Sequence, residues 1–173
     1  MDHEYYMQAA LDEAKAALAA EEFPVGCVLV LDSEIVARGR RQNSREGVSN
    51  EIDHAEVVTL RELLAERPNM DCSRIIAYST MEPCLMCYST MLLSGIRHFV
   101  YGYEDMMGGG TNLPLFQLNP LYAEMQARVQ VEAGVLRNEC LALFQRFFRN
   151  FPYWQDSLLS RYTLAQPSQD RES

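Results

Sequence analysis

This chain of 173 residues is 48% hydrophobic, which suits one compact domain with a full-sized core. It contains no apolar run of about 18 residues, and its first residues lack the basic start and apolar stretch of a secretory signal peptide, so neither a membrane protein nor a secreted protein is expected. A net charge of −9 counts against avid, non-specific binding of nucleic acid, because an acidic surface repels polyphosphates at long range.

The spacing of apolar residues predicts helices and strands that alternate through most of the chain. In chain order, the sequence predicts a helix at 4–21, strands at 25–31 and 34–38, a helix at 55–64, a strand at 73–79, a helix at 83–93, a strand at 96–103, a further helix, a strand at 129–135 and a helix at 138–148. Pro24 ends the first helix. This order predicts an α/β fold with three layers, α/β/α, around a central mixed five-stranded sheet.

The composition changes after Pro152, which divides the chain into a predicted domain at 1–152 and a C-terminal extension at 153–173. The extension carries apolar bulk at helical spacing and turns polar from Pro167, so we expect it to be partly helical and then frayed. Its apolar residues are Tyr153, Trp154, Leu158, Leu159 and Tyr162. We expect them to pack against the body of the protein or a second subunit rather than to stack on a base.

Two short motifs predict a metal site: a His-Ala-Glu triplet at 54–56 and a Pro-Cys-Leu-Met-Cys run at 83–87. One imidazole and two thiolates are a common ligand set for catalytic zinc, which keeps a fourth position for water. Either motif alone is ambiguous, because His-x-Glu arises by chance and Cys-x-x-Cys also occurs in redox pairs and as buried thiols. Together they predict one zinc bound by His54, Cys84 and Cys87.

Glu56 lies two residues past the histidine and is predicted to act as general acid/base on the metal-bound water, not as a ligand. This arrangement is a known signature of zinc-dependent nucleobase deaminases. Pro83 is well placed at the start of its predicted helix, so Cys84 and Cys87 lie one turn apart on one face. His54 occupies the same place on the preceding helix, and two positive helix ends facing one metal favour thiolates.

With these motifs, stretches at 3–11, 24–30, 82–87 and 134–149 make the chain resemble the cytidine deaminase superfamily, and within it the bacterial tRNA adenosine deaminases. The resemblance covers about residues 3–150. It implies a cytidine deaminase-like fold and a zinc-dependent hydrolase that removes the amino group of a nucleobase, releases ammonia and needs no organic cofactor. The substrate that it implies is adenosine at the wobble position of tRNA, converted to inosine.

The resemblance also implies which residues hold the substrate. Asn43, which lies 11 residues before the zinc histidine, corresponds to a family asparagine that hydrogen-bonds the target base, although a loop asparagine also caps turns. Backbone groups near Ala55 and Pro83 are expected to hold the tetrahedral intermediate. Glu56 is expected to take a proton from the water and to pass protons to the ring nitrogen and the leaving amine.

Several features leave other substrates and other kinds of protein open. RNA-editing members have a basic tail, whereas this chain has Phe-Pro-Tyr-Trp at 151–154 and then acids. Asp53 lies just before the zinc histidine, where family members have a small neutral residue. Gly108–Gly110 forms a flexible loop at the place where relatives line the approach of the substrate. The alternative substrate is therefore a free nucleobase or nucleoside of guanine, cytosine or adenine type. A non-catalytic structural zinc protein would need a fourth ligand such as His3 or His98. A dead deaminase subunit is disfavoured, because the general acid/base is present.

The basic residues bear on the predicted partner, which is either a tRNA anticodon arm or a small nucleobase or nucleoside. Of the 15 basic residues, all but Lys15 are Arg, which binds phosphate in a fork better than Lys does. Four of them, Arg38, Arg40, Arg41 and Arg45, crowd together. With Arg149 they would contact anticodon phosphates, unless surface acids such as Glu46, Glu51 and Asp53 pair with them.

We expect a homodimer, because the segment at 151–162 is apolar and relatives build their pockets near a subunit interface. Cys27, Cys72 and Cys140 lie in apolar contexts that are typical of small core residues. Free cysteines of this kind fit the reducing cytoplasm, which is the predicted location.

Overall fold

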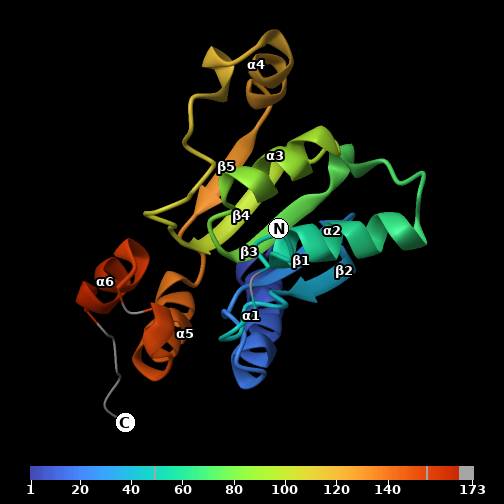
Figure 1. The fold of residues 1–173 in the computed structure, drawn as a ribbon. Coiled ribbons are helices and arrows are strands. Elements are labelled where there is room, and N and C mark those ends of the chain that lie inside the picture. The colour runs from blue at the N-terminus through green and yellow to red at the C-terminus, as the bar shows by residue number, and fades with distance from the viewer. Residues whose placement is uncertain (49, 155, 168–173) are drawn as a thin grey trace.

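A five-stranded sheet in the order β2-β1-β3-β4-β5 lies at the centre of the computed structural model (Figure 1), which describes residues 1–48, 50–154 and 156–167. The strands are β1 (Gly26–Leu31), β2 (Glu34–Arg40), β3 (Ile76–Met81), β4 (His98–Tyr103) and β5 (Gln130–Ala133). β1 pairs antiparallel with β2 and β3, whereas β3 and β5 both pair parallel with β4. This mixed sheet with its initial hairpin confirms the predicted fold class.

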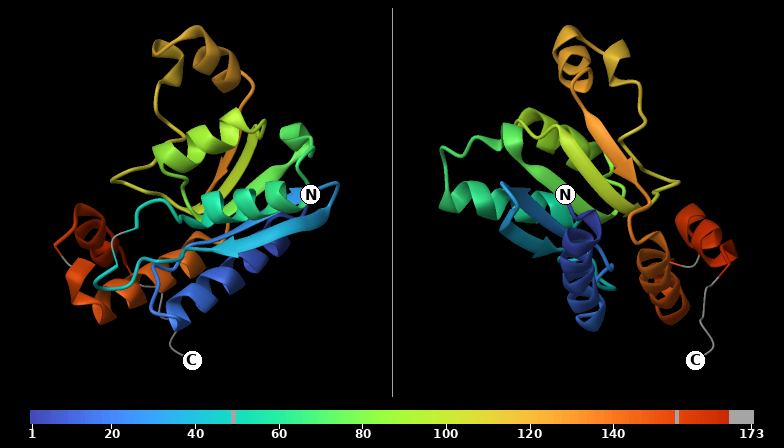
Figure 2. Two further views of the ribbon diagram at one scale, coloured as in Figure 1. Left: turned by 45° about the vertical axis from the view of Figure 1, so that its right-hand side comes forward. Right: turned by 180° about the vertical axis from the view of Figure 1, so that it is seen from behind.

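Helices cover both faces of the sheet and complete the three predicted layers (Figure 2). They are α1 (His3–Ala19), α2 (Ala55–Glu66), α3 (Leu85–Leu93), α4 (Pro120–Gln126), α5 (Arg137–Asn150) and α6 (Leu158–Ala165). α1 and α5 lie on one face, α2 and α3 lie on the other, and α6 lies beside α5. α4 is the helix predicted between the last two strands, and it stands away from the rest of the protein at the top of Figure 1.

The core lies between the sheet and the helices that cover it, because α1, α2 and α5 turn apolar side chains towards the strands. α1 buries Met7 and Leu11, and α5 buries Phe144. Gly26 allows α1 to approach β1 closely, since a Cβ at this position would lie 2.1 Å from the carbonyl oxygen of Ala10. The close packing of α1 on β1 therefore requires glycine at position 26.

The predicted core cysteines are confirmed, because Cys27, Cys72 and Cys140 are free thiols with buried side chains. A membrane crossing requires a helix that is both long and apolar, and none of the helices within the described residues is both.

The C-terminal extension packs against the body of its own chain. It forms a 3-10 turn (Pro152–Trp154) and α6, and Leu159 of α6 is 3% exposed. The hydroxyl groups of Tyr103 in β4 and Thr163 in α6 lie 3.1 Å apart. Residues 168–173, which we expect to fray, lie outside the described residues, and the division of the chain at residue 152 stays a prediction.

Candidate active site

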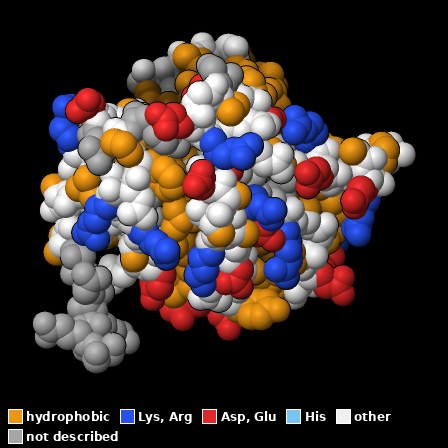
Figure 3. Space-filling view, turned by 60° about the horizontal axis from the view of Figure 1, so that its bottom comes forward, with side chains coloured by type: hydrophobic (Ala, Val, Ile, Leu, Met, Phe, Trp, Pro, Cys, Tyr) orange, Lys and Arg blue, Asp and Glu red, His pale blue; other side chains and the backbone are white. Residues whose placement is uncertain are grey.

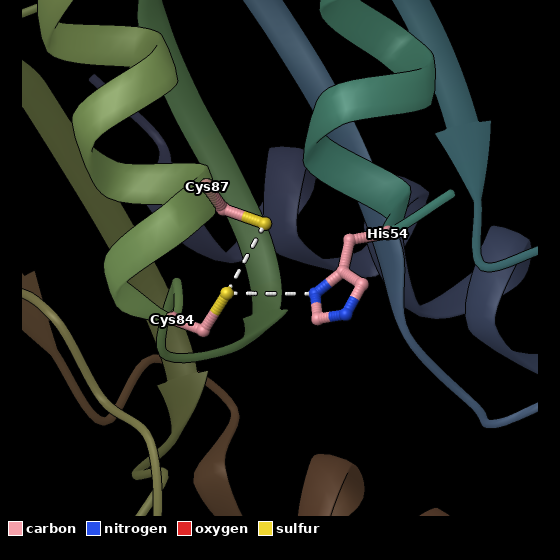
Figure 4. Close-up of side chains that lie close together, drawn as sticks. All are labelled: His54, Cys84 and Cys87. Carbon is pink, nitrogen blue, oxygen red and sulfur yellow. Dashed lines mark hydrogen bonds between the residues drawn. The ribbon is translucent and has the colours of Figure 1, made fainter. Parts of the chain in front are cut away.

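His54, Cys84 and Cys87 converge just past the carboxyl end of β3, where α2 and α3 begin (Figure 4). His54 is the N-cap residue of α2, Cys84 is the N-cap residue of α3, and Cys87 lies in the first turn of α3. Cys84 Sγ is 3.5 Å from His54 Nδ1 and 3.5 Å from Cys87 Sγ. The structure therefore brings the three predicted ligands together.

This donor set fits zinc in composition and spacing. Zinc bonds to nitrogen and sulfur of about 2.0–2.3 Å in a tetrahedron place ligand atoms roughly 3.5 Å apart, and all three ligand atoms lie within 4.8 Å of one another. His54 Nε2 lies 3.8 Å from a carboxylate oxygen of Glu51, which leaves Nδ1 to face the thiols. Three protein ligands leave a fourth position for water, as a catalytic zinc site requires.

The alternative of a closed, structural zinc site needs a fourth ligand. Over residues 1–48, 50–154 and 156–167, no further His, Cys, Asp or Glu joins the cluster. His3 and His98 instead contact Glu132 on β5, at distances of 3.3 Å and 2.9 Å. The geometry therefore favours a catalytic site over a structural one.

The two thiols hold their protons unequally. A hydrogen bond from Cys87 and the neighbouring His54 lower the pKa of Cys84 to about 4, against the opposing effect of burial. The same hydrogen bond, with burial and the charge of Glu56, raises the pKa of Cys87 well above its usual range. Because zinc is bound by thiolates, metal binding displaces the proton that Cys87 holds.

Glu56 lies beside the ligands and is 3% exposed. Its Oε1 accepts a hydrogen bond of 2.9 Å from the Ser79 hydroxyl, and its Oε2 lies 3.4 Å from Cys87 Sγ. Burial, together with the charge of Cys84, raises the pKa of Glu56 above its ordinary value. A carboxyl group whose pKa is shifted towards neutrality is suited to accept and return a proton.

A cavity of about 190 Å³ adjoins the cluster. His54, Glu56 and Cys84 contribute polar groups to its lining, and Ala55 contributes the start of α2. Its apolar side chains are Phe23, Val25, Met81, Met107, Trp154 and Leu159, and the charged residues Arg41, Glu51, Glu82 and Asp105 also line it. Such a lining, apolar with a few convergent polar groups, is typical of a small-molecule site.

Asn43 does not line this cavity in the part of the chain that the structure describes. It adopts a left-handed backbone with φ of 57°, and its Nδ2 donates a hydrogen bond of 2.7 Å to Asp53. Asp53 also accepts from Asn50 at 2.8 Å and pairs with Arg61 at 3.3 Å. The hydrogen bond from Asn43 is the main reason why the pKa of Asp53 lies below its ordinary value. The role of Asn43 towards a base stays a prediction.

The glycines at 108–110, predicted to form a flexible loop, are hydrogen-bonded to the start of α3. The Gly110 N–H donates to the Pro83 carbonyl at 2.8 Å, and the Leu85 N–H donates to the Gly108 carbonyl at 3.3 Å. A Cβ on Gly109 would lie 2.5 Å from the carboxylate of Glu82. A Cβ on Gly110 would lie 2.9 Å from backbone atoms of Leu85, so side chains at positions 109 and 110 would clash with Glu82 and with the start of α3.

Glu82 has a structural role that we did not predict from its place in the motif. Its side chain is buried, and its carboxylate accepts hydrogen bonds from the Thr111 hydroxyl and the backbone N–H of Thr111 and Asp105, at 2.5, 3.2 and 3.3 Å. It thus holds the glycine loop against the cavity. The position of this acidic residue, directly before the Pro-Cys pair, is the sequence feature that could have indicated its role.

Three of the four clustered arginines are paired with acids, as one of the two interpretations predicts. Arg41 is buried, donates to the Asn50 carbonyl at 2.7 Å and pairs with Glu51 at 3.3 Å. The other pairs are Arg40 with Glu13 and Arg45 with Glu22. Arg38 and Arg149 are exposed, and neither forms an ion pair with another described residue.

Comparison with known proteins gives a consistent result. The family model for the cytidine and deoxycytidylate deaminase zinc-binding region matches residues 1–103. The tRNA-specific adenosine deaminase of Streptococcus pyogenes serotype M18 (strain MGAS8232) is 40% identical over 146 residues, which are 84% of this chain and 89% of that protein. The tRNA-specific adenosine deaminase of Bacillus subtilis (strain 168) is 36% identical over 148 residues, which are 84% of this chain and 88% of that protein.

Solved structures share the fold. One from a study of A-to-I editing by tRNA:A34 deaminases at the wobble position of transfer RNA has a TM-score of 0.65 and 26% identity, and the match covers 80% of this chain and 98% of that chain. Guanine deaminase from Nitrosomonas europaea has a TM-score of 0.65 and 22% identity over 83% of each chain. These likenesses confirm the predicted cytidine deaminase-like fold.

Proposed function

Because this chain belongs to the cytidine and deoxycytidylate deaminase family, we propose that it hydrolyses adenosine to inosine at the wobble position of a tRNA anticodon. The 40% identity over most of its length to a protein named as a tRNA-specific adenosine deaminase is the observation that carries the choice of substrate. The site supports the chemistry, since His54 and Cys84 of the three-residue metal cluster and the buried carboxylate of Glu56 line one cavity.

The residues of the site divide the work of the reaction. When bound by His54, Cys84 and Cys87, zinc supplies a Lewis acid that lowers the pKa of a coordinated water. Glu56 accepts a proton from the attacking water and delivers it to the ring nitrogen beside the amine-bearing carbon. A C–O bond forms at that carbon, Glu56 carries the proton of the new hydroxyl group to the amine, and the C–N bond breaks as the C=O bond of the product forms. One water is consumed and one ammonia leaves.

Backbone and side-chain groups around the cavity would hold the base. Ala55 is the first residue of α2 and lines the cavity, and the N–H groups of a helix's first turn have no acceptor within the helix. The Pro83 carbonyl has one lone pair in use by Gly110 and one remaining. Asn43 does not line the cavity, so its predicted bond to the base requires a shift of the loop that carries it and of the amide that Asp53 holds.

Contacts to RNA phosphates would be few. On the face shown in Figure 3, basic side chains are interspersed with acidic ones and do not form a continuous basic surface. Of the arginines predicted to contact phosphates, Arg38 and Arg149 are exposed and form no ion pair with another described residue. Each phosphate contact contributes a salt-dependent term to binding, so we expect the affinity for an anticodon stem-loop to fall with added salt less steeply than for a strongly basic protein.

A substrate panel tests the proposal. The zinc-loaded protein is incubated with adenine, guanine, cytosine, their nucleosides and an anticodon stem-loop with adenosine at the wobble position, and ammonia release is measured. We expect the stem-loop to be the best substrate, and a matched stem-loop with guanosine at that position to be inert. Efficient turnover of a free base or nucleoside, with none on the stem-loop, would refute the RNA substrate and retain the deaminase.

We also propose a homodimer, although not through the segment at 151–162, which packs on its own chain. The α4 surface, formed by Leu113, Phe116, Leu118 and Leu121, is apolar and exposed, with Phe116 at 61% and Leu118 at 65%. Exposed apolar patches mark association sites. Light scattering should give a dimer for the wild type and a monomer for Leu118→Glu. A monomeric wild type at micromolar concentration would contradict this.

We place the enzyme in the cytoplasm. All five cysteines are free thiols, and two of them are zinc ligands that oxidation would remove. Free thiols persist in the reducing cytoplasm, which is also where a tRNA substrate would be met. Fluorescence of a tagged chain in fractionated cells would test this location.

A further inference from the structure

Two residues of the C-terminal extension, Trp154 and Leu159, line the cavity beside Glu56. Trp154 ends the 3-10 turn after α5, and Leu159 lies in α6. The chain therefore returns to the active site after the last strand and the last helix of the sheet layers. The extension forms part of the wall of the catalytic cavity.

The indole of Trp154 is held in a defined orientation. It stacks on Phe23, with ring centroids 5.3 Å apart and planes at 23°. It also meets Phe147 edge-on, at 6.5 Å and 64°. Phe23 thus covers one face of the indole, and the same side chain lines the cavity.

Hydrogen bonds fasten the extension on the far side of this wall. Tyr162 donates to the Glu104 carboxylate at 2.9 Å. Gln145 in α5 donates through Nε2 to the carbonyl groups of Thr163 and Gln166, at 3.1 Å and 2.9 Å. The wall is therefore part of the packed structure and not a loose tail.

The size and lining of the cavity suit one aromatic ring system. An engineered cavity of roughly 150 Å³ holds benzene, and this cavity measures about 190 Å³. Phe23, Trp154 and Leu159 supply apolar surface, whereas Glu56 and His54 supply polar groups. A nucleobase matches this lining, because its two faces are apolar and its edge is polar.

We propose that Trp154 is a substrate-binding residue, against which the substrate base packs while the amine-bearing edge of the base faces Glu56 and the metal ligands. This inference rests on the proposed function of the chain and deepens it, because it gives the extension a role in substrate binding. Stacking on an aromatic side chain favours planar bases through their π-faces.

Substitution separates this role from a purely structural one. Loss of base stacking should raise the KM of Trp154→Ala for the stem-loop by roughly five- to a hundredfold, with a much smaller change in kcat, and Trp154→Phe should restore most of the affinity. Leu158→Ala is the matched control, because Leu158 is an exposed residue of the same extension. A KM unchanged in Trp154→Ala, or kcat and melting temperature that fall with KM unchanged, would overturn the proposal.

Fluorescence gives a readout that does not depend on turnover. Trp154 is the one tryptophan of the chain, so its emission reports on this cavity alone. Purine riboside has no amino group to lose, and its titration into the zinc-loaded protein should quench the emission saturably in the wild type and in Leu158→Ala. Absence of a saturable change would overturn the inference, whether or not the enzyme edits RNA. Quenching without any deamination would instead refute the proposed function and leave the base site in place.

Discussion

The hydroxyl of Ser79 donates a hydrogen bond of 2.9 Å to Oε1 of Glu56, and both side chains are buried. This bond joins β3 to the first turn of α2 and fixes one oxygen of the carboxylate. The other oxygen, Oε2, lies towards Cys87. The orientation of the general acid/base is therefore set by the sheet as well as by its own helix.

Ser79→Ala should lower kcat while zinc stays bound. A hydrogen bond to a charged group contributes about 1.5–3 kcal/mol, so we expect kcat to fall roughly 10- to 100-fold. Steady-state kinetics with metal analysis on the same sample checks this. A variant with full zinc and wild-type kcat would show that Ser79 does not orient Glu56.

Cys84→Ala should abolish zinc binding at stoichiometric metal, because one of three ligands is lost and the remaining two leave the ion under-coordinated. Zinc content after gel filtration should fall to a small fraction of one per chain, and activity with it. Cys72→Ala is the control, since Cys72 is buried in the core and makes no contact with the cluster. If Cys84→Ala bound as much zinc as Cys72→Ala, Cys84 would not be a zinc ligand.

Gly109→Ala should damage the active site more than Gly108→Ala does. At position 109 the new methyl group would lie 2.5 Å from the Glu82 carboxylate and 2.7 Å from the Asp105 carbonyl oxygen. At position 108 it would meet a side-chain oxygen of Asp105 at 3.1 Å, which can move. Overpacking costs about 1–3 kcal/mol, so thermal denaturation should rank the two variants. Equal melting temperatures would contradict the close approach of this loop.

The stability that the ionised Glu104 carboxylate contributes should be lost in acid. Although burial raises the pKa of Glu104, hydrogen bonds from Arg137 at 2.8 Å and from Tyr162 at 2.9 Å outweigh that effect and hold the pKa below its ordinary value of 4.5. The folded carboxylate thus resists protonation more than the unfolded one. Its contribution is fully present above pH 4.5 and is lost as pH falls through the folded pKa.

Glu104→Gln should therefore have a melting temperature that is lower than the wild type's at neutral pH and that converges with it in acid. Melting curves between neutral pH and pH 3 check this, with Glu124→Gln as a control, because Glu124 pairs with Arg128 on the exposed surface of α4. A constant difference between Glu104→Gln and wild type across this range would contradict the assignment.

The metal cluster could be predicted because its information is local. The spacing of Cys84 and Cys87 places both at the start of one helix, and His54 is two residues from Glu56. The strands of the sheet could also be predicted, because apolar residues recur along each of them. Local pattern cannot show that α1 and the segment that follows it supply partners to distant residues, as Glu13 does for Arg40 and Glu22 for Arg45.

The substrate side of the cavity could not be predicted for the same reason. Trp154 reaches it because α5 crosses the sheet and the chain then turns back, which depends on tertiary packing. Asn43 was singled out by resemblance, but its bond to Asp53 depends on a loop with no periodicity. Sequence pattern thus defined the reactive centre, whereas the fold defines what lies around it.

Nucleoside analysis of an anticodon stem-loop by mass spectrometry is the most direct test of the central claim. After incubation with the zinc-loaded wild type, inosine should replace adenosine at the wobble position alone, in a one-to-one ratio with released ammonia. Glu56→Gln should retain its zinc and lose activity by roughly 100-fold or more, because the proton transfers are removed while the ligands remain. Absence of inosine with the zinc-loaded wild type, or its formation at an equal rate by Glu56→Gln, would contradict the claim.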